Sequence, residues 1–331
     1  MNAQPNAGFS REIDFFAAAI TALPPLPRSI QYEDEFSEKI RSIESNASHE
    51  QAVIWMMGSS FTLRFEKFDV RIREVVRSFL LMSLVDYAPG TVLFLYRNLR
   101  LIAAKTIEEV ALADPPTLQR RWANVVIDLA GETQTSLKMF VSFLCNCNFG
   151  AWKAYHRDFV SHLPTAQRDP YSVVRAGDCF LGIEEEAQLV RWLDRTAACA
   201  ATLDIQALQV ASLVLCSYQF GMRPIQLGLL RKRDCTIRFS GEGEPPVAYL
   251  TFRLAKQRNA LASRLPLLRK VKNGWAPLVV NLFNALKNES TDSFFFGFRS
   301  RVALSLRLVE KLNEILPGQG RVAYDLRHSL V

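Results

Sequence analysis

The sequence lacks the features that mark secreted, membrane-spanning or low-complexity proteins. Its N-terminus has no basic stretch leading into an apolar segment, as a secretory signal peptide would. No apolar run approaches the roughly 18 residues needed to cross a bilayer, and residues 93–101 are interrupted by Arg97 and Arg100. Only 15 Gly and 15 Pro occur in 331 residues. These absences predict a globular, cytoplasmic protein that does not bind a membrane.

Several well-known chemical motifs are also missing. The sequence contains no Gly-x-x-x-x-Gly-Lys, no Gly-x-Gly-x-x-Gly after a strand and no His-Glu-x-x-His, which argues against nucleotide hydrolysis, dinucleotide binding and zinc-dependent hydrolysis. Six cysteines without a signal peptide predict reduced thiols. Cys145, Cys147, His156 and His162 could form a metal quartet only with poor spacing, since the two cysteines would point to different helix faces. We therefore expect no metal and no cofactor.

The positive charge is concentrated in the C-terminal part of the chain. Lys and Arg total 40 against 33 Asp and Glu, giving +7 overall. Residues 201–331 hold 19 basic and 9 acidic groups, net +10, whereas residues 1–200 hold 21 and 24, net −3. Nucleic acid is the commonest polyanion available to such a protein. The charge distribution therefore predicts nucleic acid as the partner.

The hydrophobic pattern predicts a mainly α protein of two domains. Residues 1–50 are expected to form an N-terminal arm leading to a short helix, and residues 51–165 an all-helical domain. Pro and Gly interrupt residues 166–181, as in a linker. Residues 182–331 are expected to form a mixed α/β domain, mostly helical, with strands at 235–239, 247–254 and 264–268 in a small antiparallel sheet.

The junction between two helices in this second domain carries an unusual arginine. Asp204 is a good N-cap for one helix, Gly221 suits its end, and Pro224 suits the first turn of the next. Arg223 therefore lies at a helix N-terminus, where a cation is unfavourable unless an anion joins it. Alternatively, Arg223 satisfies carbonyls at the end of the preceding helix.

A set of residues with a specific order is distributed over the C-terminal part. The set comprises Gly221-Met222-Arg223, then Leu227, Leu230 and Asp234, then Lys256 between two strands, then Asp325-Leu326-Arg327-His328. This set resembles the catalytic domain of tyrosine recombinases, the phage-integrase family, whose partner is double-stranded DNA. The motifs cover about residues 182–331. The preceding helical domain resembles this family's core-binding domain by type and position. The resemblance implies a site-specific DNA recombinase or integrase, acting through a 3′-phosphotyrosine together with other recombinase protomers on DNA in a bacterial or phage system.

The resemblance also implies catalytic roles for individual residues. Arg223 and Arg327 would hold the oxygens of the scissile phosphate, because guanidinium groups bind phosphate bidentately and stay protonated. Lys256 would protonate the leaving 5′ oxygen as a general acid. The alternative for Lys256 is a simple phosphate contact on a basic hairpin. His328 fits a supporting position after the second Arg.

The sequence departs from the family at three points. Tyr324 stands where the family usually has His, and a phenol is a poor acid or base at neutral pH. Gln226 stands where the family often has Glu, three residues after the first Arg. Val331 precedes the region where the family carries its nucleophilic Tyr. We expect either a truncated sequence or a protein that cannot cut DNA with its own nucleophile.

A dense basic segment between the two arginine motifs predicts the DNA-facing surface. Residues 223–272 hold 12 Lys or Arg and 3 acidic groups. The DNA-binding candidates in this segment are Arg231, Lys232, Arg233, Arg258 and Arg264. Three alternatives remain open: a recombinase relative without a nucleophile that assists an active partner, a type IB topoisomerase relative, and a helical regulator in which Arg223 and Arg327 lie far apart.

Overall fold

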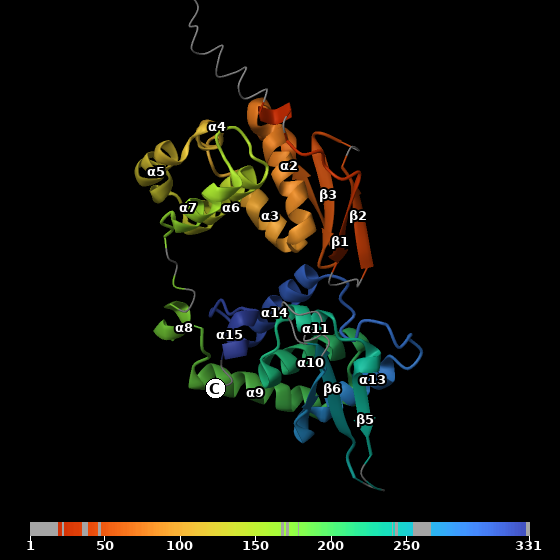
Figure 1. Ribbon diagram of the computed structural model, residues 1–331. Coiled ribbons are helices and arrows are strands. Elements are labelled where there is room, and N and C mark those ends of the chain that lie inside the picture. Colours follow the sequence, from red (N-terminus) through yellow and green to blue (C-terminus); the bar gives the residue numbers. More distant parts are fainter. Residues whose placement is uncertain are drawn as a thin grey trace, which may run out of the picture. The chain divides into compact units, whose positions relative to one another are not determined.

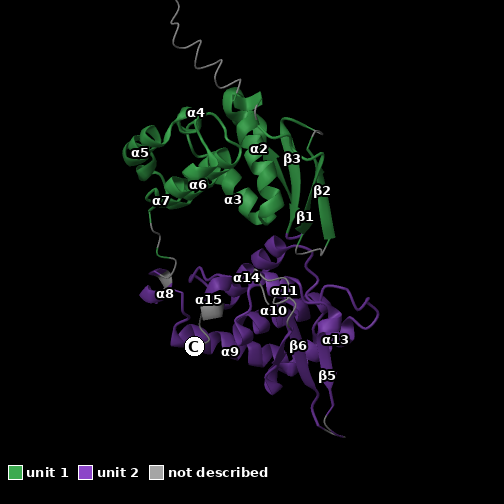
Figure 2. Ribbon diagram, viewed as in Figure 1, with its two compact units in different colours: residues 1–56, 60–169 green, residues 57–59, 170–331 purple. Residues whose placement is uncertain are grey.

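The chain forms two compact units, each with its own buried hydrophobic core (Figures 1 and 2). The structure is a computed structural model that describes residues 19–21, 23–34, 39–45, 48–166, 169, 172–177, 179–239, 241, 244–253 and 266–328. The first unit contains residues 1–56 and 60–169, and the second contains residues 57–59 and 170–331. The described part is mainly helical with small antiparallel sheets, which confirms the mainly α prediction.

The first unit begins with strands that the sequence pattern does not predict. β1 (Ser29–Asp34) pairs antiparallel with β2 (Lys39–Glu44), and β3 (Gln51–Met56) pairs with β4 (Ser59–Arg64). Ala52 and Ile54 are buried whereas Val53 and Trp55 are exposed, which is the period-two alternation of a half-buried strand. The predictions of a helical segment from residue 51 and of a short helix after the arm are therefore wrong, because periodicity does not separate helix from strand in runs this short.

The remainder of the first unit is helical, as the sequence predicts. Its helices are α2 (Val70–Asp86), α3 (Pro89–Leu99), α4 (Ala104–Leu112), α5 (Pro115–Asn124), α6 (Gly131–Asn146) and α7 (Arg157–His162). The Asp69 and Asp114 carboxylates cap α2 and α5 by accepting bonds from backbone N–H groups at 2.9 Å. The apolar positions expected on α6 are fully buried, namely Leu137, Phe140, Val141 and Leu144.

The second unit is built around one buried helix. Its helices are α8 (Ser172–Ala176), α9 (Ile183–Ala198), α10 (Ile205–Phe220), α11 (Pro224–Gly228), α13 (Ala276–Ala285), α14 (Arg301–Ile315) and α15 (Ala323–His328). α10 packs against α9, α11, α13, α14 and α15. Asp204 caps α10 through a 2.7 Å bond from the Ala207 N–H. Gly221 ends it with φ of 58°, a left-handed conformation that favours glycine.

A three-stranded antiparallel sheet lies in the second unit beside these helices. Its strands are β5 (Cys235–Arg238), β6 (Val247–Arg253) and β7 (Pro266–Lys270), with β6 in the centre. Along β6, alternate residues Ala248, Leu250 and Phe252 are at most 1% exposed, and α13 packs against this strand. One face of the sheet is therefore part of the core, and the other is open.

The helices of the described part were compared with the length and hydropathy of a membrane-spanning helix. None of them combines the length and hydropathy that a bilayer crossing requires.

Candidate nucleic-acid interface

Arg223 lies at the junction that the sequence predicts for it. α10 ends at Phe220, Gly221 turns the chain, and Arg223 is the N-cap residue of α11 with extended backbone angles. Pro224 occupies the first turn of α11, where its missing N–H costs no helical hydrogen bond. The Arg223 side chain is half-buried. The turn therefore fixes the backbone of Arg223 at the edge of the buried helix pair.

Gln226 connects this junction to the central strand of the sheet. Its Oε1 accepts a 3.2 Å hydrogen bond from the Arg223 N–H, and its Nε2 donates a 2.7 Å bond to the Arg253 carbonyl. Gln226 is only 8% exposed. An amide can accept and donate at once, whereas an ionised Glu could only accept. A Glu at this position would thus not make the second bond unless it were protonated.

The segment that carries Lys256 leaves the sheet next to this link. Lys256, Arg258 and Arg264 themselves lie outside the described residues. The flanking residues Arg253 and Pro266 pair with each other at the ends of β6 and β7. Gln226 therefore ties the backbone of Arg223 to the strand end from which the predicted catalytic hairpin departs.

The second arginine motif lies on α15. This helix packs against α10 and α14, and α11 packs against the same two helices. The Asp325 carboxylate accepts a 2.9 Å bond from the Val322 N–H, and Leu326 is fully buried against the core. Tyr324 is 43% exposed. The backbones of Arg327 and His328 belong to α15, while their side chains lie outside the described part.

An ion pair that the sequence pattern does not predict lies just before the start of α15. Arg321 donates two hydrogen bonds to the Glu185 carboxylate, at 2.8 and 2.7 Å, from Nε and Nη2. Glu185 also accepts a 2.7 Å bond from the Gly182 N–H at the start of α9. The hydrogen bonds from Arg321 lower the pKa of Glu185. The partners are 136 residues apart, so no local sequence signal announces the pair.

Two of the predicted DNA-binding residues are buried in structural roles. The Arg231 guanidinium lies 3.5 Å from the centre of the Phe294 ring, and burial lowers its pKa. The Lys232 ammonium donates 2.9 Å bonds to the carbonyls of Lys287 and Glu289. Both residues are 9% exposed, so we leave them out of the proposed interface.

Arg233, the third of these neighbouring candidates, is exposed. Its side chain is 44% exposed and forms an ion pair with Asp292. An exposed pair of this kind contributes little stability and can exchange partners. Arg233 therefore stays a candidate for phosphate contact.

The four residues considered as metal ligands in the first unit make other contacts. Burial raises the pKa of the Cys145 and Cys147 thiols to about 11, which opposes the thiolate form that binds metals. His156 Nδ1 accepts a 3.2 Å bond from the Lys153 N–H, and the His162 ring bonds the Asp158 carbonyl at 2.8 Å. Among the described residues, no group of three or more potential ligands clusters as a metal site would require.

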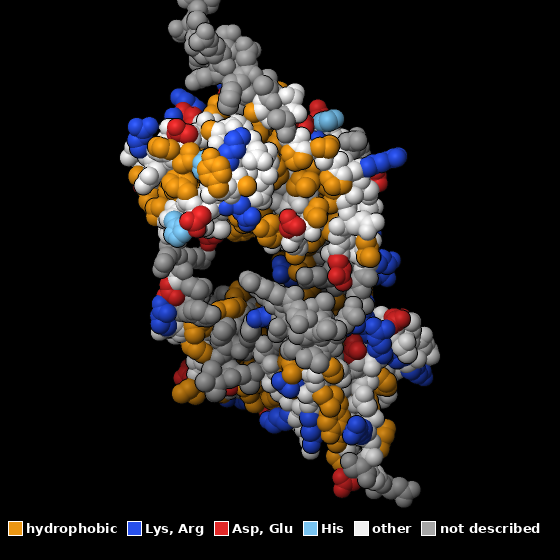
Figure 3. All heavy atoms as spheres, viewed as in Figure 1, with side chains coloured by type: hydrophobic (Ala, Val, Ile, Leu, Met, Phe, Trp, Pro, Cys, Tyr) orange, Lys and Arg blue, Asp and Glu red, His pale blue; other side chains and the backbone are white. Residues whose placement is uncertain are grey.

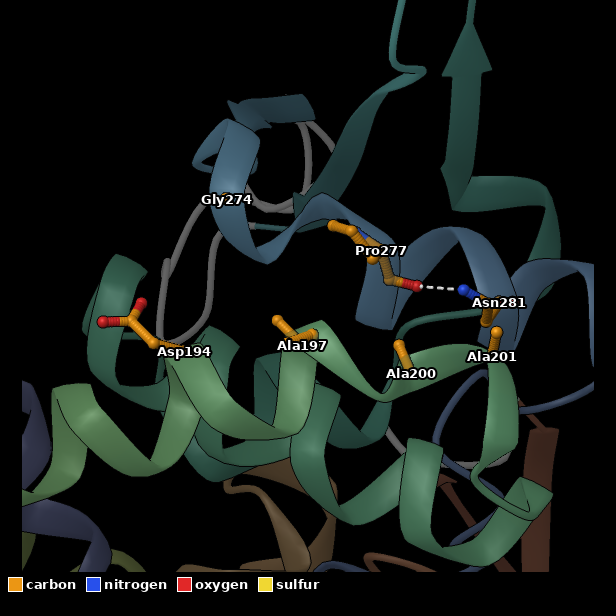
Figure 4. Close-up of a pocket in the computed structure, with 8 residues that line it drawn as sticks. Asp194, Ala197, Ala200, Ala201, Gly274, Pro277 and Asn281 are labelled. Carbon is orange, nitrogen blue, oxygen red and sulfur yellow. Dashed lines mark hydrogen bonds between the residues drawn. The ribbon is translucent and has the colours of Figure 1, made fainter.

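A shallow pocket of about 470 Å³ lies away from these motifs, between the end of α9 and α13 (Figure 4). Its wall is largely alanine, including Ala197, Ala200 and Ala201. Its polar groups are already used: Asp194 accepts a 2.7 Å bond from the Trp275 indole, and Asn281 donates to the Pro277 carbonyl at 2.8 Å. The pocket has the composition of a packing groove rather than of a chemical site.

No model of a protein family matches the chain, and no curated protein sequence is significantly similar to it.

Proposed function

We propose that this chain binds double-stranded DNA in a bacterial cytoplasm and takes part in breaking and rejoining DNA strands as a site-specific recombinase of the tyrosine type. The proposal assigns Arg223, Lys256 and Arg327 to one phosphodiester, with Tyr324 and His328 beside it. It requires no metal or cofactor, because two guanidinium groups and one ammonium supply the positive charge that the reaction needs.

The bridge made by Gln226 is the observation that carries this proposal. Its two bonds hold Arg223 and the end of β6 together, although they are 30 residues apart in the chain. Lys256 follows Arg253 by three residues. The shared packing of α11 and α15 on α10 and α14 adds the second arginine motif to the same helix cluster. A single phosphate contacting all three cations needs this kind of arrangement.

The proposed chemistry divides between holding the phosphate and moving one proton. Arg223 and Arg327 stabilise the charge that develops on the non-bridging oxygens as a tyrosine oxygen attacks phosphorus. The P–O bond to the 5′ oxygen breaks, and Lys256 donates the proton that this oxygen takes up. The reverse reaction rejoins the strands. The attacking tyrosine is not assigned to any of the 331 residues, because none of their tyrosines occupies the position that the motif gives to the nucleophile.

The second candidate function is DNA occupancy without cleavage, in support of an active partner. The exposed Tyr324 favours this candidate, since a phenol can donate a hydrogen bond to phosphate but is a weak acid and base near neutral pH. Both candidates place a phosphate between the two arginine motifs. They differ in whether a tyrosine supplied by a partner restores strand cleavage.

The common requirement is that Arg223 and Arg327 lie close together, and cysteine cross-linking tests it. Cys199, the exposed cysteine of the described part, is first changed to Ser. A short bis-maleimide should then join Arg223→Cys to Arg327→Cys, seen by mass spectrometry of the linked peptides.

The control pair combines Arg223→Cys with Arg195→Cys in the last turn of α9. Arg195 lies nine residues, or about 14 Å of helix, beyond Glu186, whose side chain bonds Tyr218 near the end of α10. Absence of the Arg223–Arg327 link, or equal linking of the control pair, would remove the proposed phosphate site.

A further inference from the structure

The open face of the three-stranded sheet is basic. Because Ala248, Leu250 and Phe252 point into the core, Tyr249 and Arg253 point to the opposite side of β6. This open side is the "basic sheet face". Its members on the three strands are Thr236, Arg238, Val247, Tyr249, Thr251, Arg253, Pro266, Leu268 and Lys270.

The strand register places two cations on this face. Arg238 pairs with Val247 and Lys270 pairs with Tyr249, and residues opposite each other in antiparallel strands share a face. The Arg238 guanidinium lies 5.2 Å from the centre of the Tyr249 ring. In Figure 3, Lys and Arg side chains border a stripe of hydrophobic side chains over β5 and β6.

These cations have no acidic neighbours on the sheet. β5, β6 and β7 contain no Asp or Glu. Within the part of the chain that the structure describes, neither Arg238 nor Lys270 has an ion-pair partner. Arg231 and Lys232, by contrast, are used in internal contacts. The basic sheet face is thus complementary to a polyanion.

The spacing on this face suits the backbone of duplex DNA. Arg238 and Lys270 stand two strand spacings apart and two residues apart along the sheet, which separates their Cα atoms by about 12 Å. This span is about the width of the DNA major groove, so the two side chains can reach phosphates on either side of a groove. An arginine stacked on tyrosine keeps its edge free for phosphate, and Thr236 and Thr251 add hydroxyl donors.

We propose that the basic sheet face binds phosphates of duplex DNA next to the phosphate assigned to Arg223 and Arg327. The inference rests on the proposed function in taking DNA as the partner, and it adds a second contact surface. Gln226 makes the two surfaces continuous, because it joins the Arg223 backbone to Arg253, which belongs to the basic sheet face. DNA held at the arginine pair would therefore continue across the sheet.

The test measures how affinity for DNA depends on salt. The full chain is titrated into a fluorescein-labelled 40-bp duplex of random sequence between 50 and 200 mM NaCl, and binding is read by anisotropy. The sheet variant is Arg238→Gln with Lys270→Gln, which keeps part of each aliphatic stem. The matched control is Arg191→Gln with Arg195→Gln, which removes the same charge from the exposed side of α9.

The sheet variant should lose affinity at least about tenfold at 100 mM NaCl, and its log–log salt slope should become shallower by about 1.8, since each lost phosphate contact removes about 0.9. The control should keep the wild-type slope. Circular dichroism of both variants confirms that they fold.

Three results would overturn the inference. If the wild-type chain binds the duplex and the sheet variant keeps its slope, the sheet face is not a DNA contact while the proposed function stands. If poly-glutamate competes as well as DNA of equal charge, the face recognises an acidic protein instead. If the wild-type chain does not bind the duplex at 50 mM NaCl, the inference and the proposed function fail together.

Discussion

Replacing Gln226 by Leu should selectively loosen the junction between α11 and β6. Leu has nearly the volume of Gln but can neither accept from the Arg223 N–H nor donate to the Arg253 carbonyl. Gln226 is 8% exposed, so water cannot readily replace both bonds. A buried backbone group that loses its partner costs about 1–3 kcal/mol. Two such groups cost about 2–6 kcal/mol together, and burying the apolar Leu side chain returns about 1–2 kcal/mol, so the net loss is about 1–4 kcal/mol.

The chain provides a matched control in Gln219. Its Nε2 donates to the Lys270 carbonyl and its Oε1 accepts from the Lys272 N–H, each at 3.1 Å, so it also bridges two backbone groups. These bonds lie at the surface, where water can take their place. Gln219→Leu should therefore cost less than about 1 kcal/mol. Because each variant loses two hydrogen bonds, the difference between their losses of stability measures the effect of burial.

Calorimetry and hydrogen exchange together check this prediction. The unfolding transition of the second unit should fall on the order of 10 °C in Gln226→Leu and less than about 4 °C in Gln219→Leu. Exchange measured by mass spectrometry should rise in peptides covering residues 221–230 and 247–253 of the first variant. Equal destabilisation of the two variants, or unchanged exchange in these peptides, would refute the reasoning.

Replacing Gln226 by Glu should make the stability of the protein depend on pH in a predictable direction. In Gln226→Glu, only the protonated acid can donate to the Arg253 carbonyl, so burial and this bond raise the folded-state pKa above the unfolded value of about 4.3. A raised pKa contributes stability below the unfolded pKa and loses it as pH rises through the folded pKa. The variant should thus approach wild-type stability near pH 4 and fall below it by pH 8. A pH-independent difference in urea unfolding would contradict this.

Three further predictions concern the anchor of α15 and the DNA. Arg321 lowers the pKa of Glu185, so the pair stabilises the fold above the unfolded pKa of Glu. This stabilisation is lost as pH falls through the folded-state pKa of Glu185. In urea titrations, Arg321→Met should therefore lose less stability than the wild type between pH 6 and pH 3. Duplex binding by the full chain should weaken steeply with salt, and a flat salt dependence would exclude a phosphate-dominated interface. On a nicked duplex carrying a site selected for binding, the chain alone should form no covalent DNA adduct on a denaturing gel, because no tyrosine follows Tyr324; an adduct would reveal an unrecognised nucleophile.

Helix boundaries in the second unit were predictable because each carries a local signal. Asp204, Gly221 and Pro224 act through caps, a left-handed backbone and a fixed φ, which depend on a few neighbouring residues. The strands of residues 29–64 were not predictable in the same way. Their apolar positions are six-residue runs, and their stabilising partners lie across a turn or on another element, which no local period records.

The same distinction holds for the candidate site. The motif order on the sequence predicts which residues belong to it, but not the contacts that hold them. The sequence marks Gln226 only as a departure from Glu, whereas in the structure its amide joins α11 to β6. No local pattern marks Arg321 and Glu185 as a pair, because 136 residues separate them. Long-range hydrogen bonds of this kind are properties of packing and leave no spacing signature.

The fold determines which charged residues of the sequence are accessible to a partner. The +10 of residues 201–331 counts Arg231 and Lys232, yet both are buried against a ring and against carbonyl oxygens, so their charged groups are not available for direct contact with a phosphate. Arg238 and Lys270 carry the same formal charge on an open face without acids. The field that a polyanion encounters therefore depends on which cations the strand alternation turns outward, and a slip of one residue in the pairing of β6 would bury Tyr249 and expose Leu250 without changing the net charge.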